Sequence, residues 1–449
     1  MMLEMLTLFT FISTDSSTNL LMCNTIFGIL NFNLKFQLGG ISISFCLLTS
    51  ILIFICLLLI WDKPFFVEQS LCLFFLQFFV IGAFTASNLF YFYVFFEAVV
   101  IPMYIMIVLF GSRNRKVRAA NLLFYYTLVS SAMLLLSIGG IYATFGTTDF
   151  EFLLSDEGFI TLPSFVQDFL WLTFFFAFAT KMPLTPFHTW LPEAHVEAST
   201  PGSVLLAGIL LKLGLYGLIL FCLMLLPDSS NFFAPYVFVV AIFGAIYTAV
   251  LAIRQQDLKR VIAYSSVSHM CAATVGVFSQ HLGGVQASFF QGISHGFISV
   301  GLFSLVGFIY DRTGSRDIQK YAGLTRLMPL FSFFFLFFTL SNLALPGFSS
   351  FVGEFGIMYS AFIKNIYGAF FLLTTVIIVG GYSLLLSNRI LFGDLNRVSL
   401  EFLSDINLRE ISISSLLVFF VIFLGVRPSL ITETFNDPLI LVLKFIYQY

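Results

Sequence analysis

The sequence predicts an all-helical protein that crosses a membrane many times. Of its 449 residues, 59% are hydrophobic and only 10% are charged, whereas a soluble domain usually carries about 25% charged residues. The mean hydropathy of +1.00 requires apolar segments along most of the chain. These segments come in runs of about 16 to 25 residues, the length that a helix needs to span the hydrocarbon core. We therefore expect one polytopic membrane domain.

Each long apolar run is expected to be a helix, because a backbone inside lipid must satisfy its own hydrogen bonds. Short polar loops separate about twelve such runs. They cover residues 41–61, 71–86, 89–110, 121–144, 165–182, 203–226, 232–253, 261–278, 285–309, 330–363, 366–386 and 411–426. This division predicts a short N-terminal segment at 1–40, a membrane domain at 41–428 and a C-terminal tail at 429–449.

The basic residues are distributed unequally between the loops on the two sides of the membrane. With alternating loops, one side receives about fifteen of the 21 Lys and Arg residues, as expected for the side of synthesis. These are Lys63, Arg113, Arg115, Lys116, Arg118, Arg254, Lys259, Arg260, Arg312, Arg316, Lys320, Arg326, Arg389, Arg397 and Arg409. The other side receives Lys35, Lys364, Arg427 and Lys444, and its largest loop, 146–164, is acidic. This segregation supports the span count and predicts that both termini lie on the side poor in basic residues.

Two glutamates and two lysines fall well inside the predicted spans: Glu97, Lys181, Lys212 and Glu354. Asp168 lies near the start of its span, where it can reach the interface. An ionised group at the bilayer centre costs about 2.5 to 3.5 kcal/mol, so four unpaired groups would cost on the order of 10 kcal/mol. Pairing of Glu97 with a lysine, internal water and broken-helix backbone can offset this cost, and each is also a component of a proton path. A fixed ion pair that only orients the helices is the alternative.

Helix-breaking residues accompany these charges. Pro102 follows Glu97 by five residues, so we expect the helix to bend just past the carboxylate and to admit water. Lys181 stands directly before Pro183 and Pro186, where freed carbonyls could solvate an ammonium group.

Lys212 lies about nine residues into its span, which places it near the middle of the membrane. Glycines at 208, 214 and 217 flank it. Such small residues allow neighbouring helices to approach closely.

A short internal repeat precedes two of the predicted helix breaks. Residues 174–180 read FFFAFAT and residues 333–339 read FFFLFFT, and each copy is followed within a few residues by proline. Because each copy leads into an interrupted helix with an ionisable residue, the pattern is typical of repeated transporter halves with broken helices at the midplane. A chance match in a chain with 61 Phe residues is the alternative.

Two of the five histidines are candidates for proton transfer. His269 and His295 lie within predicted spans and are flanked by Ser and Gly, which can hydrogen-bond or hold water. Histidine both donates and accepts protons near neutral pH, so we expect relay roles for this pair, with simple packing as the alternative. His281 is expected to be a loop residue.

His188 and His195 belong to the segment PFHTWLPEAHVEAST, which also holds two glutamates. A metal site here is disfavoured, because Pro192 interrupts any helical face of ligands and the HExxH spacing is absent. Loop structure or access for protons is the preferred interpretation.

The sequence contains no recognisable cofactor motif. The six cysteines are scattered without a CxxC pair, and they are expected to pack as small apolar residues. A dinucleotide-binding glycine pattern, a P-loop and a basic tract for nucleic acid are also absent from the sequence. We therefore expect the energy source to lie in another chain or in an ion gradient.

Five segments resemble the antiporter-like membrane subunits of respiratory complex I. They read FFEAVVIPMY, FATKMPLTPFHTWLPEAHVEASTPGSVLLAGILLKLGLYG, QDLKRVIAYSSVSHM, ISHGFISVGLF and LPGFSSFVGEF. The resemblance covers about 41–428 in order and with few gaps, and the long second segment is its most specific part. A glutamate at position 354, where related subunits carry lysine, narrows the resemblance to one group within the family.

The resemblance implies a core membrane subunit of the proton-translocating NADH:ubiquinone oxidoreductase. It implies that partner subunits bind NADH, FMN, iron–sulfur clusters and ubiquinone and carry out the redox chemistry. It also implies a proton relay of six residues, namely the breakable pair Glu97 and Lys181, the central lysine Lys212, the connecting histidines His269 and His295 and the terminal carboxylate Glu354. Opening of the pair would send a proton from Lys181 to Lys212 and on through His269 and His295 to Glu354.

The expected surroundings follow from the same resemblance. Partners are other membrane-arm subunits, including neighbouring antiporter-like subunits, together with membrane lipids. Family members usually have two further helices before the segment GGISISFCLL, so the N-terminal spans are expected to be truncated here. A Phe-rich composition and the lack of a visible presequence predict synthesis inside a mitochondrion and a place in its inner membrane, with a bacterial plasma membrane as the alternative.

Two other function classes remain open at this level. A subunit of a multisubunit cation/proton antiporter would share these motifs without redox partners, and sodium-linked proton exchange without NADH would favour it. A structural scaffold would tolerate neutralisation of Glu97, Lys181 and Lys212 without loss of activity.

Overall fold

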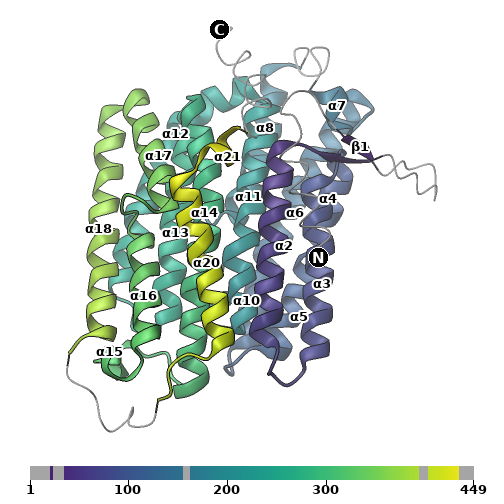
Figure 1. Cartoon of the computed structure of the whole chain (residues 1–449). Helices are drawn as coiled ribbons and strands as arrows, with labels where there is room; N and C mark the ends of the chain where they lie inside the picture. Colours follow the sequence, from purple (N-terminus) through teal and green to yellow (C-terminus); the bar gives the residue numbers. More distant parts are fainter. Residues whose placement is uncertain (1–20, 24–34, 155–161, 394–402, 434–449) are drawn as a thin grey trace.

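The computed structural model describes residues 21–23, 35–154, 162–393 and 403–433. Long helices run side by side between two ends of the molecule (Figure 1). One small antiparallel pair, β1 (Leu21–Cys23) and β2 (Phe36–Leu38), departs from the expected all-helical fold. The strand β1 occupies part of the predicted N-terminal segment, and the remainder of the segment before residue 35 lies outside the described residues.

The first part of the bundle contains five of the predicted spans, each close to its expected place, and α4 and α5 are the two halves of one of them. Its helices are α2 (Gly40–Ile60), α3 (Phe66–Thr85), α4 (Leu89–Ala98), α5 (Val100–Phe110), α6 (Lys116–Phe145), α7 (Phe150–Leu153), α8 (Ser164–Lys181) and α9 (Trp190–Glu197). The next span is a composite of α10 (Thr200–Leu205), η1 (Leu206–Leu210), α11 (Leu211–Gly217) and η2 (Leu218–Met224), in which η1 and η2 are π-helical. A π-helical turn is wider than an α-helical one and typically marks a functional position.

The second part of the bundle continues with equally long helices. They are α12 (Pro227–Ile253), α13 (Leu258–Val277), α14 (Leu282–Thr313), η3 (Ile318–Lys320), α15 (Leu324–Leu327), α16 (Pro329–Asn342), α17 (Ser349–Lys364), α18 (Ile366–Leu391), α20 (Leu408–Val426) and α21 (Ser429–Thr432). Within the described ranges, nine helices are long and apolar enough to cross a membrane. The three other predicted spans are helical as well, but they are shorter, broken or richer in polar residues.

Both predicted breaks occur where the internal repeat ends. Helix α8 ends at Lys181, and the chain resumes as α9 only at Trp190. The single span expected at 330–363 is in fact two helices, because α16 ends at Asn342 and α17 begins at Ser349. Gly347 between them has a φ of +98°, a conformation that residues with a Cβ rarely adopt.

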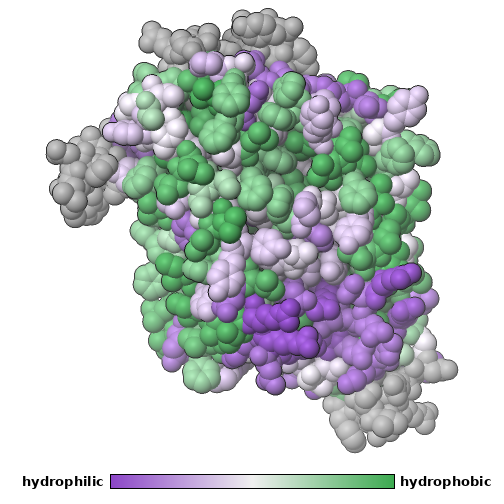
Figure 2. Space-filling view, turned by 180° about the vertical axis from the view of Figure 1, so that it is seen from behind, coloured by the Kyte–Doolittle hydropathy of each residue, from purple (hydrophilic) through white to green (hydrophobic). Residues whose placement is uncertain are grey.

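The basic loops meet at one end of the molecule, as the charge distribution predicted. Three ion pairs join segments that are far apart in sequence there: Lys63 to Asp311 at 2.9 Å, Arg113 to Asp257 at 3.1 Å and Arg260 to Glu193 at 2.8 Å. Figure 2 shows hydrophilic residues gathered at this end, below a surface dominated by hydrophobic residues. The described chain ends β1 and α21 lie at the opposite end (Figure 1).

Close packing places two spans at the centre of the bundle, the single helix α14 and the composite of α10, η1, α11 and η2. The spanning windows of α14 and of α10 to η2 are 100% and 94% buried, respectively. A Cβ at Gly214 would lie 2.8 Å from the backbone nitrogen of Met182, so this glycine is needed for α11 to pack against the end of α8. The predicted role of the glycines near Lys212 is therefore confirmed, and it brings the segments that carry Lys181 and Lys212 together.

Candidate functional site

Glu97 lies in the last turn of α4, beside a break in the helix. Helices α4 and α5 are separated at Val99, and Pro102 cannot donate a hydrogen bond to the carbonyl of Ala98 four residues earlier. The expected interruption just past the carboxylate is therefore confirmed. The Oε1 atom of Glu97 is buried without a hydrogen-bond partner among the described residues.

Lys181 is the last residue of α8, and its side chain points towards α4. Its Nζ atom is buried, has no hydrogen-bond partner in the described parts of the chain and lies 4.4 Å from the centroid of the Phe96 ring. A cation over an aromatic face is stabilised electrostatically. Glu97 and Lys181 interact through their charges, but they do not form a direct ion pair within 4.0 Å. The two partners of the expected pair are thus near each other, but their charged groups are not in direct contact.

Lys212 is fully buried in the centre of the bundle. Its Nζ donates a hydrogen bond of 2.5 Å to the carbonyl of Ala207, five residues earlier. Ala207 belongs to the π-helix η1, so the widened turn supplies an acceptor for the ammonium group. The same Nζ lies 3.2 Å from Nδ1 of His295 on α14.

Two histidines and a glutamate follow Lys212, although Nε2 of His269 has no hydrogen-bond partner among the described residues. The ring of His295 lies beside that of His269 on α13, with centroids 5.8 Å apart. Nδ1 of His269 lies 2.8 Å from Oε1 of Glu354 on α17, and Gln291 donates a further hydrogen bond of 3.2 Å to the same oxygen. Contacts therefore link Lys212 to Glu354 across four helices.

The structure brings the six predicted residues into two groups. The first is the pair Glu97 and Lys181, and the second is the linked set that runs from Lys212 to Glu354. His295 contacts Lys212 and His269 contacts Glu354, so the histidines occur in the reverse of the order expected from the sequence. Between the groups, Lys181 and Lys212 are joined only through the packing of α8 against α11.

The remaining histidines occupy different environments. His281 caps the N-terminus of α14, where its Nδ1 accepts a hydrogen bond of 3.1 Å from the backbone of Gly283, so the prediction of a loop residue is confirmed. His188 packs edge-on against Tyr247, and His195 stacks on Phe303 with ring centroids 4.6 Å apart. Among the described residues, no cluster of three His, Cys, Asp or Glu side chains could hold a metal ion.

Sequence reasoning missed two buried cations. Lys259 and Arg316 were assigned to surface loops, but they are only 1% and 2% exposed. Arg316 donates hydrogen bonds to the carbonyl of Val196 and to Ser112, and its guanidinium group covers the ring of Tyr310. Both cations are held by backbone carbonyls near the end of α9, Val196 for Arg316 and Ala198 for Lys259, and hydropathy along the chain carries no signal of these contacts.

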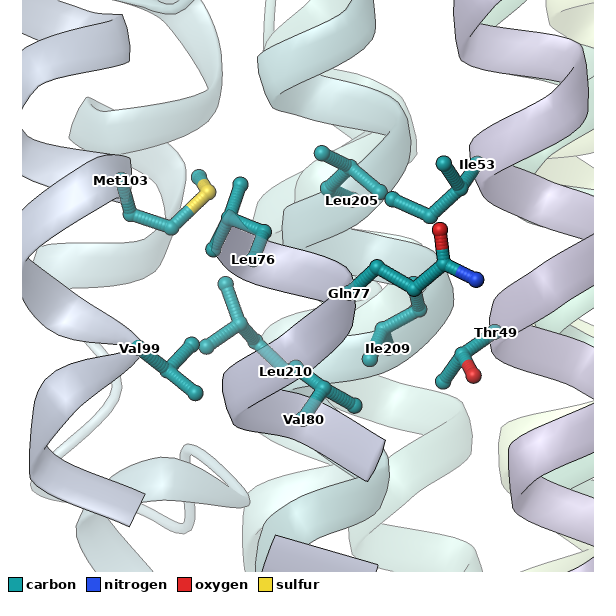
Figure 3. Close-up of a pocket in the computed structure, with 10 residues that line it drawn as sticks. All are labelled: Thr49, Ile53, Leu76, Gln77, Val80, Val99, Met103, Leu205, Ile209 and Leu210. Carbon is teal, nitrogen blue, oxygen red and sulfur yellow. The ribbon is translucent and has the colours of Figure 1, made fainter. Parts of the chain in front are cut away.

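A pocket elsewhere in the bundle does not belong to the site. Figure 3 shows it between α2, α3, α5 and the start of the composite span. Its lining consists of Thr49, Ile53, Leu76, Gln77, Val80, Val99, Met103, Leu205, Ile209 and Leu210. Apart from Thr49 and Gln77 these side chains are apolar, and none of the six predicted residues is among them. The pocket is therefore a packing feature of the helix interface.

Comparisons with known proteins agree with this arrangement. Residues 86–379 match the family described as NADH:quinone oxidoreductase/Mrp antiporter, TM. The chain is 44% identical over 402 residues to NADH-ubiquinone oxidoreductase chain 4 of Chondrus crispus, an alignment that covers 89% of this chain and 81% of that protein. It is 41% identical over 415 residues to NADH-quinone oxidoreductase subunit M of Rhodobacter capsulatus, an alignment that covers 90% of this chain and 81% of that protein.

A solved structure shows the same fold. One chain in the structure of respiratory complex I from Thermus thermophilus with bound NADH superposes with a TM-score of 0.89 and 28% sequence identity, covering 99% of this chain and 93% of that one. The family match spans more than half of the chain, and the relatives are covered over most of their length. The chain therefore belongs to the family of antiporter-like membrane subunits of NADH:quinone oxidoreductase, in the group called chain 4 or subunit M.

Proposed function

We propose that this subunit translocates protons across the membrane while partner subunits of complex I oxidise NADH and reduce ubiquinone. The observation that supports this function best is the linked set Lys212, His295, His269 and Glu354. Each member is buried; Lys212 contacts His295, His269 contacts Glu354, and the two histidine rings lie with centroids 5.8 Å apart. Groups that exchange protons, held in sequence through the centre of a bundle, are the requirement for a proton relay.

The relay works by successive transfers of one proton. The ammonium group of Lys212 releases a proton to Nδ1 of His295, and an imidazole that gains a proton at one ring nitrogen can lose one from the other. Internal water carries the proton from His295 to Nε2 of His269, and Nδ1 of His269 then passes a proton to Oε1 of Glu354, which becomes a neutral carboxylic acid. Release from Glu354 to the far side resets the relay.

The pair of Glu97 and Lys181 controls the supply of protons to Lys212. A carboxylate close to Lys181 favours the ammonium form, whereas burial alone disfavours it. Redox-driven movement elsewhere in the complex shifts the distance between the two groups and so changes how readily Lys181 gives up its proton. The structure corresponds to the separated state of the pair, in which Glu97 forms no direct ion pair with Lys181 and holds the proton on its ammonium group less strongly.

In this proposal, residues 41–428 form one membrane domain of two repeated helix bundles. The nine long apolar helices are completed to about twelve crossings by α8 with α9, by α13 and by α16 with α17. Each bundle then contains one broken helix next to an ionisable residue, Lys181 in the first and Glu354 in the second.

The proposal also includes the partner subunits and the membrane. NADH, FMN, iron–sulfur clusters and ubiquinone are bound by partner subunits, and neighbouring antiporter-like subunits and lipids cover the apolar faces of the bundle. The subunit resides in the mitochondrial inner membrane, as the Phe-rich composition predicts.

A vesicle experiment separates this function from cation/proton antiport. Purified complex I that contains this chain is reconstituted into vesicles, and internal pH is followed with a dye. We expect acidification to require NADH and ubiquinone and to be insensitive to replacement of Na⁺ by K⁺, because the driving force comes from electron transfer. Sodium-linked proton exchange in the absence of NADH would instead identify an antiporter subunit.

A further inference from the structure

One buried hydrogen-bond acceptor close to Glu354 is unused. Gln291 on α14 is only 1% exposed, and its Nε2 atom donates a hydrogen bond of 3.2 Å to Oε1 of Glu354. The carbonyl oxygen of the same amide is also buried, but it accepts no hydrogen bond from any described residue. Buried polar atoms without a partner are rare in folded proteins, so this oxygen requires an explanation.

Two side chains meet at the same oxygen of Glu354. Nδ1 of His269 lies 2.8 Å from this Oε1 atom, and Nε2 of Gln291 reaches the same atom from α14. His269 delivers the proton in the proposed relay, whereas Gln291 stands one helical turn before His295 and has no part in it so far. After the transfer, the new O–H group of Glu354 therefore has two neighbours within hydrogen-bonding distance.

An amide can bond to either protonation state of a carboxyl group. Its NH₂ group donates to an ionised carboxylate, and its carbonyl oxygen accepts from a neutral carboxylic acid. The two ends of the amide have nearly the same shape, so a half-turn about the last side-chain bond exchanges them without moving the helix. The structure shows the donating orientation of Gln291, which matches an ionised Glu354.

Gly353 leaves room for this half-turn. A Cβ atom at position 353 would lie 2.4 Å from the side-chain oxygen of Gln291 and 2.8 Å from its Cβ. The half-turn brings Nε2 to the place that this oxygen now holds, so a larger residue would occupy the space that the amide needs. The glycine directly before Glu354 thus keeps the amide free to turn.

We propose that Gln291 is a catalytic residue that holds the proton on Glu354 after its transfer from His269. This proposal rests on the proposed function, because it concerns the last transfer of the same relay. The N–H bond of His269 breaks, and an O–H bond forms at Oε1 of Glu354. The amide of Gln291 then turns, and its carbonyl oxygen accepts a hydrogen bond from the new O–H group. That hydrogen bond replaces the one to His269, so the proton does not return along the path by which it came.

Release of the proton restores the first arrangement. Loss of the proton to the far side leaves Glu354 ionised, and an ionised acceptor forms a stronger hydrogen bond with an N–H donor than a neutral one does. The amide of Gln291 therefore turns back without gaining or losing a proton of its own. Its hold on the proton matters most when a proton gradient opposes transport, because return of the proton then competes most strongly with its release.

The proposal is tested in the assembled complex with Gln291→Met and Gln291→Leu. Both side chains have a volume close to that of glutamine, but neither has an amide that could donate or accept a hydrogen bond. The matched control Gln255→Met changes a glutamine whose Nε2 donates to the backbone carbonyl of Leu251 at the end of α12. NADH oxidation in the presence of an uncoupler confirms that each complex is assembled.

Vesicles with and without an opposing pH gradient measure the protons translocated per NADH oxidised. Against the gradient, we expect both Gln291 variants to lose at least about tenfold, the factor that one hydrogen bond to a charged group typically contributes, and the control to pump normally. Without the gradient, the loss should be clearly smaller. Equal losses in the two conditions would mean that Gln291 only keeps the carboxylate in place. That result, or normal pumping against the gradient, would overturn the proposal.

Infrared difference spectra of the wild-type enzyme test the half-turn directly. On addition of NADH, we expect a side-chain amide signal to change together with the carboxyl band of Glu354. Carbon-isotope labelling of the glutamine side chains shifts this signal, and Gln291→Leu removes it. A Glu354 band without an accompanying amide signal rejects the role of Gln291 and leaves the relay intact. If the Glu354 band itself is missing, the relay is rejected and the role of Gln291 falls with it.

Discussion

Replacing Lys212 with methionine is expected to abolish NADH-driven proton pumping by the assembled enzyme. Methionine fills nearly the same volume, so the packing around η1 and α14 is retained, but it has no proton to give to His295. Removal of a proton donor from a transfer step typically slows the step by about 10²-fold or more. The rate of dye-detected acidification in vesicles, divided by the rate of NADH oxidation, measures the effect.

A matched control is Lys63→Met. This lysine is partly exposed and pairs with Asp311 at the basic end, and surface pairs of this kind contribute only about 0 to 1 kcal/mol. The control should pump normally. Lys212→Met with a normal ratio of protons to NADH would remove Lys212 from the proton path.

Replacing Glu354 with glutamine should have an effect of similar size. The amide can still accept the hydrogen bond from Gln291, so the local geometry of α17 is preserved. It cannot take up the proton that His269 delivers, and the relay stops one step before release. We expect at least about a 10²-fold loss of pumping with little change in the thermal stability of the complex.

Glu410→Gln provides the contrast, because Glu410 is an equally buried carboxylate outside the relay. It pairs with Arg312 through two hydrogen bonds of 3.0 and 2.6 Å. Breaking a buried pair of this kind usually costs about 3 to 5 kcal/mol. This variant should therefore lower the unfolding temperature while the complex that does assemble pumps with a normal ratio of protons to NADH. Equal pumping losses in the two variants would argue for a general effect of buried carboxylates.

Hydropathy and charge were sufficient to predict most of the bundle. Runs of apolar residues located the helices within a few residues, and the basic loops were correctly assigned to one end. Proline identified the breaks after Glu97 and Lys181. The separation of α16 from α17 was only partly anticipated, because a continuous apolar run hides a break that depends on the backbone conformation at Gly347.

The members of the site could also be found from the sequence, whereas their connections could not. Glu97, Lys181, Lys212 and Glu354 stand out because an ionisable side chain in an apolar run requires compensation. The order of the two histidines depends on how α13 and α14 pack against each other, which periodicity within one helix does not encode.

The burial of Lys259 lies beyond sequence reasoning for a similar reason. Charged residues flank it in sequence at Asp257 and Arg260, and the groups that bind its ammonium come from the turn after α9 and from α10. Segments about 60 residues apart in sequence meet only through tertiary packing. The residues next to Lys259 in the sequence therefore do not reveal this contact.

Infrared difference spectroscopy of the working enzyme tests the central claim most directly. The carbonyl stretch of a protonated carboxyl group is recorded on addition of NADH, and the band that disappears in Glu354→Gln is assigned to Glu354. If protons reach Glu354 through Lys212, this band appears in the wild-type enzyme and is missing in Lys212→Met. An unchanged Glu354 band in Lys212→Met would contradict the proposed relay.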